Sequence, residues 1–433
     1  MSVNFKDSLR YWIRLGFTNF GGPAGQIAMM HKDLVERKQW ISEENFLRAL
    51  NFCMILPGPE AQQLATYIGW RMHGIWGGLV AGVWFILPSI FVLLALSWLA
   101  AAYRDVSFVF GIFYGLQAVV IAIVAEAVQR IGKRTLHHWV LFLFAVGAFV
   151  AIYFLRVPFP AIVFAAATLG IILSLRWPQV FRPRGHGPSG EKGQGNETPT
   201  TMASYPPITR TVKVISIFVV LWILPVGAIV AWLGFSNIFI QEAVFFTGAA
   251  FVTFGGAYSV LSYIADVAVN VYGWLEPGQM VQGLALAEST PGPLIMVTQF
   301  VGFLGAWKLH GELSPVLSGT LGALIVTYVT FLPCFMFIFA GAPYVEALAG
   351  NHRLQAGLVG VTSAVVGVIL NLAVFFATHA LFPKGGQIDL FVLVLSVIAF
   401  WVLWRLRWQI HTVVGWGAAI GVAWVLGRNA LSL

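Results

Sequence analysis

Residues 56–71 read LPGPEAQQLATYIGWR, and residues 288–299 read ESTPGPLIMVTQ. Both stretches place Pro-Gly-Pro inside an apolar segment, at residues 57–59 and 291–293. Proline removes a backbone donor and clashes with the preceding turn, and glycine relaxes the backbone, so the tripeptide must break a helix. Each stretch is therefore predicted to hold a broken helix, with a new helix beginning after the second proline.

The rest of the chain is apolar enough to lie in a membrane. Apolar residues make up 59% of the 433 positions and charged residues 10%, which is far from the composition of soluble domains. A helix needs about 20 apolar residues to cross the hydrocarbon, and a β-barrel would show alternation instead. Uncharged runs of about spanning length occur at residues 74–103, 106–125, 139–155, 157–175, 214–241, 313–345, 354–383, 390–404 and 408–427. We interpret most of them as transmembrane helices, so the predicted fold class is an all-α, multi-pass helical bundle.

Other classes of function lack their sequence signals. The net charge of +8 comes from Lys and Arg in short loops beside the spans, which membrane topology explains better than nucleic-acid binding. Only Cys53 and Cys334 are present, both in apolar stretches, so no disulfide framework or metal-spaced cluster is expected. No phosphate-binding loop, dinucleotide fingerprint or catalytic motif appears in a suitable context. We predict no catalytic residue, no metal and no cofactor, and therefore not an enzyme.

An internal repeat divides the chain into two halves. At an offset of 234 residues, Phe20-Gly21-Gly22 aligns with Phe254-Gly255-Gly256, Trp40 with Trp274, and the first Pro-Gly-Pro with the second, all without a gap. Between residues 182 and 207 the chain is rich in Gly and Pro and nearly free of apolar residues, a composition that favours a flexible linker. The predicted units are a first repeat at 1–175, a cytoplasmic linker at 176–211, a connecting transmembrane helix at 212–235 and a second repeat at 236–433.

The charges of the two copies differ in a way that predicts inverted topology. Lys32, Arg37, Lys38 and Arg48 of the first copy align with Asp266, Val271, Tyr272 and Gln282 of the second. Cytoplasmic loops retain Lys and Arg while translocated loops do not, so the two repeats are expected to lie with opposite orientation, as in many transporters. Basic residues on both sides of residues 49–70 further predict a re-entrant hairpin whose turn is Pro57-Gly58-Pro59.

The two breaks are the expected substrate site. Irregular backbone survives in hydrocarbon only where it meets protein, water or a ligand, and in transporters the freed helix N-termini point at anionic substrates. We expect both breaks to approach each other near the membrane centre. The alternatives are packing kinks at Pro-Gly-Pro and close helix approach at the Gly-Gly pairs. The predicted substrate-binding residues are Gly21, Gly22, Pro57, Gly58, Pro59, Gln62, Gln63, Gly255, Gly256, Pro291, Gly292, Pro293 and Gln299.

Intramembrane and flanking charges supply further candidates. Glu288 lies three residues before Pro291 in an apolar stretch, so it is the candidate for proton coupling; the alternative is a carboxylate bonded to a half-helix N-terminus. Glu126 and Glu242 are interpreted as structural. Lys32, Arg37 and Arg71 are candidates for a basic funnel at the cytoplasmic mouth, although topology alone also accounts for them.

These motifs resemble one known family. The stretches that carry the resemblance are Phe20-Gly21-Gly22-Pro23, Trp40-Ile41-Ser42-Glu43-Glu44, Leu56-Pro57-Gly58-Pro59, Tyr67-Ile68-Gly69-Trp70-Arg71, Thr253-Phe254-Gly255-Gly256-Ala257-Tyr258 and Glu288-Ser289-Thr290-Pro291-Gly292-Pro293. Both halves are similar to the chromate transporter family in its two-domain form, the linker excepted. Glu60 departs from the pattern, because a smaller neutral polar residue is more usual there.

The resemblance implies a function that composition does not give. It implies export of the chromate dianion across the bacterial inner membrane, which confers chromate resistance. Because no phosphate-binding loop appears in the sequence, the energy is expected to come from an ion gradient, such as that of protons, or from a partner. Sulfate or another tetrahedral oxyanion is the alternative substrate, and an anion channel is a further alternative. Expected partners are chromate and the lipid bilayer, without nucleic acid, and a homo-oligomer stays open.

Overall fold

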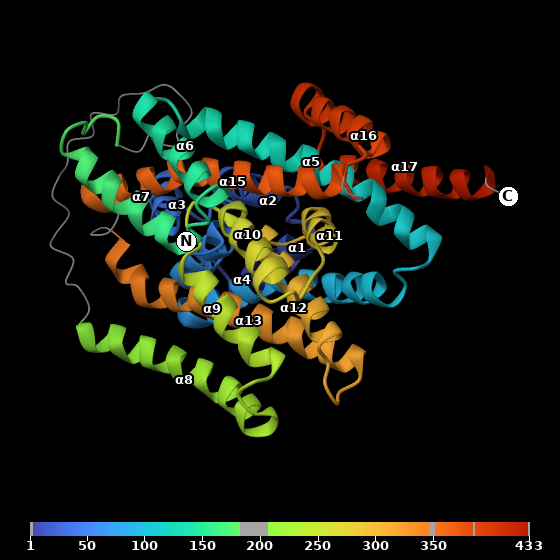
Figure 1. Ribbon diagram of the computed structural model, residues 1–433. Coiled ribbons are helices and arrows are strands. Elements are labelled where there is room, and N and C mark those ends of the chain that lie inside the picture. The colour runs from blue at the N-terminus through green and yellow to red at the C-terminus, as the bar shows by residue number, and fades with distance from the viewer. Residues whose placement is uncertain (1–2, 182–206, 346–350, 384–385, 432–433) are drawn as a thin grey trace.

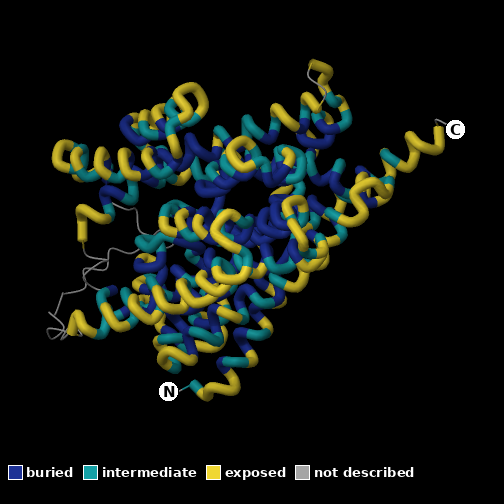
Figure 2. Tube along the Cα trace, turned by 60° about the horizontal axis from the view of Figure 1, so that its bottom comes forward, coloured by how far each residue is buried: buried dark blue, intermediate teal, exposed yellow. Residues whose placement is uncertain are grey.

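The computed structural model describes residues 3–181, 207–345, 351–383 and 386–431. Over these residues the chain is helical and contains no strand. Six of the described helices are long and apolar enough to cross a membrane, which confirms an all-α, polytopic membrane protein. Many large apolar side chains are exposed, including Trp76 and Phe91. Along the trace, buried residues gather in the centre and exposed residues lie around the periphery (Figure 2). The predicted flexible linker falls mainly on residues 182–206, which lie outside the described part.

The two halves repeat the same order of helices (Figure 1). The first half comprises α1 (Phe5–Thr18), α2 (Gly22–His31), the π-helix η1 (Lys32–Arg37), α3 (Glu43–Ile55), α4 (Glu60–Ala102), α5 (Ser107–Thr135), α6 (Trp139–Tyr153) and α7 (Phe159–Ser174). The second half comprises α9 (Ile238–Phe251), α10 (Ala257–Asp266), the π-helix η2 (Val267–Val271), α11 (Pro277–Ser289), η3 (Leu294–Met296), α12 (Val297–Lys308), α13 (Pro315–Gly341), η4 (Ala342–Tyr344), α15 (His352–Leu381), α16 (Leu390–Trp401), η5 (Val402–Leu406) and α17 (Ile410–Leu431). Helix α8 (Ile208–Leu233) connects them along the outside and buries little of its surface.

The helix ends follow the sequence repeat closely. Both ends of α11 lie 234 residues after the ends of α3, and each half places a π-helix at the same point. Ser42 begins α3 by accepting a hydrogen bond from the Asn45 amide, and Glu276 begins α11 with a capping box that includes Gln279. Polar caps at matched positions satisfy the free amides of both helix starts, so local sequence sets this part of the repeat.

Helix α4 is two helices folded against each other. Its dihedral angles leave the helical region at His73 and at Gly74, where φ is +65°. A Cβ atom added at Gly69 would lie 2.4 Å from the Gly77 carbonyl oxygen, so the arm at 60–73 runs back along the arm at 74–102. Helices α12 and α13 make the corresponding pair, and there a Cβ at Gly302 would lie 2.9 Å from the Gly322 oxygen.

Helices of one half pack along helices of the other. Helix α5 lies along α16 and α17, and α15 lies along α6 and α7 (Figure 1). Glycines allow close contacts here: a Cβ at Gly115 would lie 2.0 Å from the Gly417 oxygen, and one at Gly170 would lie 2.6 Å from the Ala356 oxygen. Small residues let membrane helices approach in this way. The two halves therefore interlock and form one core.

Matched central helices run in opposite directions. Gly78 of α4 lies against Phe339 of α13, and Gly82 lies against Phe335, so the residue numbers rise along one helix as they fall along the other. The arm at 74–102 and helix α13 occupy equivalent places in the repeat. Two equivalent spans that run antiparallel enter a bilayer from opposite faces, which is the geometry of an inverted repeat.

Several apolar runs form helices shorter than the spans inferred from the sequence. Helices α6 and α7 have 15 and 16 residues, about 22–24 Å at 1.5 Å per residue, against a hydrocarbon core of about 30 Å. The run at 214–241 is also divided, because α8 ends at Leu233 and α9 begins at Ile238. The sequence separated the runs of α6 and α7 at Arg156, but apolar composition did not detect the break at Gly234–Asn237 that divides the run at 214–241.

Candidate functional site

Each Pro-Gly-Pro forms the tip of a helical hairpin. Helix α3 and the arm at 60–73 run antiparallel, since Phe52 contacts Tyr67 near the tip and Arg71 Nη2 donates to Asn45 Oδ1 at the base, 3.1 Å away. Helices α11 and α12 form the second hairpin, where Lys308 Nζ at the base donates to the Gly273 carbonyl at 2.7 Å. The predicted hairpin with its turn at Pro57-Gly58-Pro59 is thus present, and the second half forms a matching hairpin with its turn at Pro291-Gly292-Pro293.

The tips are held by the opposite halves through matched contacts. The Gly58 amide donates to the Thr253 carbonyl oxygen at 2.8 Å, and the Gly292 amide approaches the Asn19 carbonyl oxygen at 3.4 Å. Asn19 and Thr253 directly precede the two Phe-Gly-Gly motifs. Gln26 adds an asymmetric link, because its Nε2 lies 2.8 Å from the Asn19 oxygen and 2.6 Å from the Gly292 oxygen. The Gly-Gly turns and the Pro-Gly-Pro tips therefore belong to one cluster.

Glycine at each tip is required by its conformation and by its neighbours. The φ angles are +126° at Gly58 and +120° at Gly292, values that favour glycine. A Cβ at Gly58 would lie 3.0 Å from Cys334 Sγ, and one at Gly292 would lie 2.7 Å from Ser89 Cβ. Cys334 and Ser89 each follow the internal proline of α13 or α4. Cys334 thus packs on a tip, as expected of a packing residue.

The predicted glutamine ligands are buried and already use their amide donors. Gln62 Nε2 donates to Thr66 Oγ1 at 3.1 Å, Gln63 Nε2 to the Pro57 oxygen at 2.8 Å, and Gln299 Nε2 to the Ile90 oxygen at 2.8 Å. The Oε1 atoms of Gln62 and Gln63 have no partner among the described residues. In this conformation the hydrogen bonds of the glutamines stabilise the helices and turns at the breaks.

A small cavity lies where the two halves meet. Its lining includes Pro59 and Glu60 of the first half and Gly256, Pro293 and Leu294 of the second, so the two breaks approach each other. Its volume is about 10 Å³, roughly the least that holds one water molecule. A tetrahedral oxyanion does not fit, and the structure is therefore closed around this point. Of the Gly-Gly pairs, Gly256 reaches the cavity.

Two glutamates accompany the breaks. Glu60 lines the cavity. Arg134 of α5 is the positively charged side chain that interacts electrostatically with the Glu60 carboxyl group. Glu288 is buried and accepts a hydrogen bond from the Tyr258 hydroxyl, two residues after Gly256. Arg130 and Glu126 of α5 are the charged groups that act on Glu288. The Glu288 carboxylate is thus bonded to a side chain, and the alternative of a bond to a half-helix N-terminus is not observed.

Glu242 is more isolated than its sequence position suggested. Its side chain is fully buried on α9, and no described residue bonds either carboxylate oxygen. A Cβ added at Gly305 would lie 2.7 Å from one oxygen, and one at Gly322 would lie 3.0 Å from the other. The two glycines of the second helix pair make room for this carboxyl group. A carboxyl group buried without partners is costly unless it is neutral.

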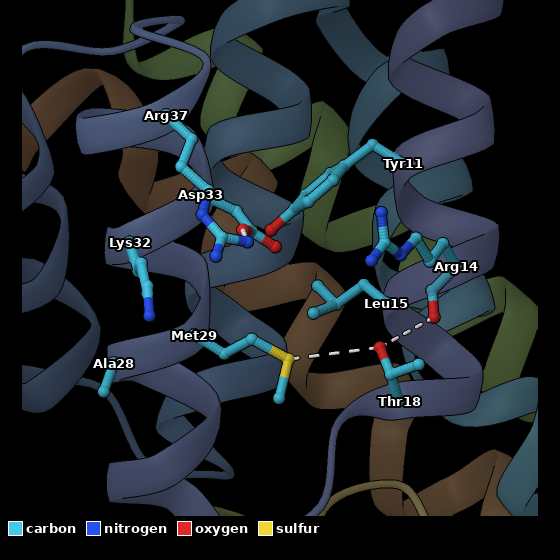
Figure 3. A pocket seen from close by; sticks show the side chains of 9 residues that line it. All are labelled: Tyr11, Arg14, Leu15, Thr18, Ala28, Met29, Lys32, Asp33 and Arg37. Atoms are coloured by element: carbon cyan, nitrogen blue, oxygen red, sulfur yellow. Dashed lines mark hydrogen bonds and ion pairs between the residues drawn. The ribbon is translucent and has the colours of Figure 1, made fainter.

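Two of the three predicted funnel residues share a larger cavity. Lys32 and Arg37 line a cleft of about 460 Å³ between α1 and the helix formed by α2 and η1, together with Tyr11 and Arg14 (Figure 3). Arg71 does not line it, because Arg71 holds the base of the first hairpin. The cleft therefore brings Lys32 and Arg37 together, and Arg71 lies outside it.

Several residues of the cluster were missed by sequence reasoning. Asn19, Gln26, Thr253 and Tyr258 touch the breaks or their carboxylates. All four are polar and lie inside or beside the matched glycine motifs. That position in the sequence could have identified them as candidates. Ser89 gave no such signal, since it lies in a long apolar run far along the chain.

Comparison with known proteins gives a consistent result. A family model for chromate transporters matches residues 7–171 and 240–422. The chain is 32% identical to a chromate transport protein of Pseudomonas aeruginosa, over 85% of this chain and 80% of that protein. It is 28% identical to a chromate transport protein of Cupriavidus metallidurans (97% and 92%) and 28% identical to a probable chromate transport protein of Synechococcus elongatus (94% and 91%). No solved structure matches the chain.

Proposed function

The chain belongs to the chromate transporter family, and from this premise we propose that it is a secondary transporter that exports the chromate dianion from the cytoplasm across the inner membrane. Its relatives are transporters. The single observation that carries the proposal is the meeting of two broken hairpins from opposite halves around one small cavity. Chromate resistance is the expected consequence of export.

The tips are suited to an anion that must also leave. A helix N-terminus presents free amides and about half a positive charge, so two termini offset part of a double negative charge without a buried Lys or Arg. In the closed structure the tip amides face the Asn19 and Thr253 carbonyl oxygens. We propose that substrate oxygens take the place of these carbonyls when the halves move apart. The proposed substrate-binding set remains the glycines, prolines and glutamines of the two breaks.

The membrane potential supports the outward direction. An inside-negative potential favours outward movement of negative charge by about 2.3 kcal/mol per charge per 100 mV. A dianion therefore gains about twice that amount. Proton coupling is the second part of the proposal, with Glu288 as the coupling residue, because its carboxyl group lies beside the second break and the matched position of the first half holds Met54.

Transport into inverted membrane vesicles tests the function. Labelled chromate should accumulate under an imposed potential or proton gradient, because the cytoplasmic face then lies outside. Sulfate, molybdate and phosphate are added as competitors, and vesicles without the protein are the control. Accumulation of sulfate in preference to chromate would favour the alternative substrate. A channel would equilibrate chromate without accumulating it under a proton gradient alone. Failure of chromate to accumulate under any gradient would refute the proposal.

A further inference from the structure

The cleft between α1 and η1 has the composition of an anion site. Three cationic side chains line it, from Arg14, Lys32 and Arg37, and a single carboxylate, from Asp33. Asp33 Oδ1 lies 3.1 Å from Arg37 Nη1 and holds that guanidinium in place. The remaining excess of positive charge matches a dianion. A volume of about 460 Å³ leaves room for an oxyanion with part of its hydration shell.

A buried hydroxyl in the cleft has no partner. The Tyr11 side chain is 5% exposed, and no described residue bonds its hydroxyl. The ring packs edge-on against Trp40 at 5.8 Å, and it points from α1 toward η1 (Figure 3). Burial, with a further contribution from Asp33, raises the pKa of the Tyr11 phenol above its ordinary value. The phenol is therefore a hydrogen-bond donor at neutral pH.

The second half shows that packing does not require this hydroxyl. Phe245 occupies the position that matches Tyr11, and its ring packs edge-on against Trp274 at the same 5.8 Å. The other cleft residues also lose their charge at the matched positions. Arg14, Lys32, Asp33 and Arg37 align with Gly248, Asp266, Val267 and Val271. The same scaffold is thus basic and hydroxylated in one half only.

The cleft and the central cluster adjoin along the chain. The lining of the cleft includes Leu15, Thr18 and Met29, and Thr18 is followed directly by Asn19. The Asn19 carbonyl faces the second Pro-Gly-Pro tip. A residue that lines the cleft is therefore adjacent in the chain to the residue that faces the second break.

We propose that this cleft is a loading site in which Tyr11, Arg14, Lys32 and Arg37 bind a tetrahedral oxyanion group on one side of the membrane only. The proposal rests on the proposed function, since loading has meaning only if the oxyanion is then transported. The opposite half offers no equivalent site, so anions are captured from the face where η1 lies and are released at the other face without being held.

Binding by the full-length protein in nanodiscs of neutral phosphatidylcholine tests the proposal. Sulfate serves as the probe because it is not reduced, and titration calorimetry measures its dissociation constant. Tyr11→Phe, which installs the residue of the other half, should weaken binding about tenfold, as expected for one hydrogen bond to a charged group. Arg14→Gln should weaken it at least as much. Arg10→Gln removes the same charge from an exposed position outside the cleft, and should change binding less than twofold at physiological salt.

A second arm identifies the source of the oxyanion. Nanodiscs that contain phosphatidylglycerol offer a lipid phosphate of the same chemistry. Weaker sulfate binding in these discs, for the wild type but not for Arg14→Gln, would support the cleft with a lipid headgroup as its occupant. Unchanged binding would support the free oxyanion.

Two results overturn the proposal or separate it from the proposed function. Sulfate binding by Tyr11→Phe and Arg14→Gln that equals wild type, with thermal stability retained, refutes the loading site even if vesicles transport chromate. Where vesicles transport chromate, Tyr11→Phe should raise KM about tenfold from the η1 face and leave the maximal rate unchanged. Absence of transport by the wild type refutes the proposed function, while binding in nanodiscs still decides the cleft.

Discussion

At the scale of single residues, the two halves share a framework but not its charged groups. Glu288 and its hydrogen-bond donor Tyr258 align with Met54 and Ala24 of the first half. Both are buried, and Arg130 and Glu126 of α5 are the other charged groups that act on the carboxyl group. A buried ionisable residue in a membrane protein is costly and usually functional. Each break therefore has one carboxyl group beside it, Glu288 in the second half and Glu60 in the first, at positions that do not match in the repeat.

Glu288→Gln tests this assignment. The amide keeps the size of the carboxyl group but binds no proton, so chromate uptake into inverted vesicles should no longer respond to an imposed proton gradient. Uptake driven by membrane potential alone should persist. Tyr258→Phe is the matched control, because it removes the hydrogen bond and leaves the carboxyl group, and its gradient response should remain. A Glu288→Gln variant with an unchanged gradient response would exclude this residue as the coupling group.

The structure shows that substitutions of the tip glycines would disturb packing as well as any anion site. Valine at Gly58 or Gly292 would clash with Cys334 or Ser89 and would strain a positive φ. Loss of transport by such variants would follow whether or not an anion binds there. Gly256 lines the central cavity and a Cβ there meets nothing within 4 Å, so a substitution at this position avoids the clash, but its φ of +97° still disfavours any residue other than glycine.

At the scale of elements, each half is built from helical hairpins whose arms touch through glycine. The closest contact is in α4, where a Cβ at Gly77 would lie 2.2 Å from the Gly69 carbonyl oxygen. A backbone oxygen inside a helix cannot move aside as the end of a flexible side chain can. The hairpin that carries the first break therefore depends on this glycine pair.

Gly77→Ala should lower the stability of the protein. The added methyl group would overpack the contact and force the two arms apart. Overpacking of this kind typically lowers the free energy of unfolding by about 1–3 kcal/mol. The midpoint of thermal unfolding in detergent should fall below that of the wild type. Gly227→Ala in α8 is the matched control, since nothing lies within 4 Å of the added methyl group, and its midpoint should not fall. Equal midpoints for the two variants would contradict the close approach of the arms.

At the scale of the whole molecule, the halves interlock around an approximate two-fold relation. Helix α5 packs on α16 and α17, while α15 packs on α6 and α7. The matched spans at 74–102 and in α13 are antiparallel, as the Gly78 and Gly82 contacts show. An equivalent feature of the two halves should therefore face opposite sides of the membrane.

Cysteine labelling measures this sidedness. Glu36 and Asn270 are exposed and occupy matched positions in η1 and η2. With Cys53 and Cys334 replaced by serine, Glu36→Cys should react with an impermeant thiol reagent from the cytoplasm, and Asn270→Cys from the periplasm. Intact cells and inverted vesicles provide the two directions. Labelling of both positions from the same side would refute inversion.

The sequence by itself determined the all-α membrane class, the repeat and the position of both breaks. These properties are local: apolar length, Pro-Gly-Pro and the helix caps act within a few residues of themselves. The re-entrant turn followed from the same local signals, with the basic residues on both sides.

Only the tertiary structure decided which partners surround the breaks. Ser89 and Cys334 reach the tips from long apolar helices of the opposite half, and the Asn19 and Thr253 carbonyls face the tip amides. Arg71 separates from Lys32 and Arg37 because a hairpin base holds it. Such contacts form only when helices of one half pack against helices of the other, which lie hundreds of residues away in the chain. No hydrophobic periodicity within either half predicts them.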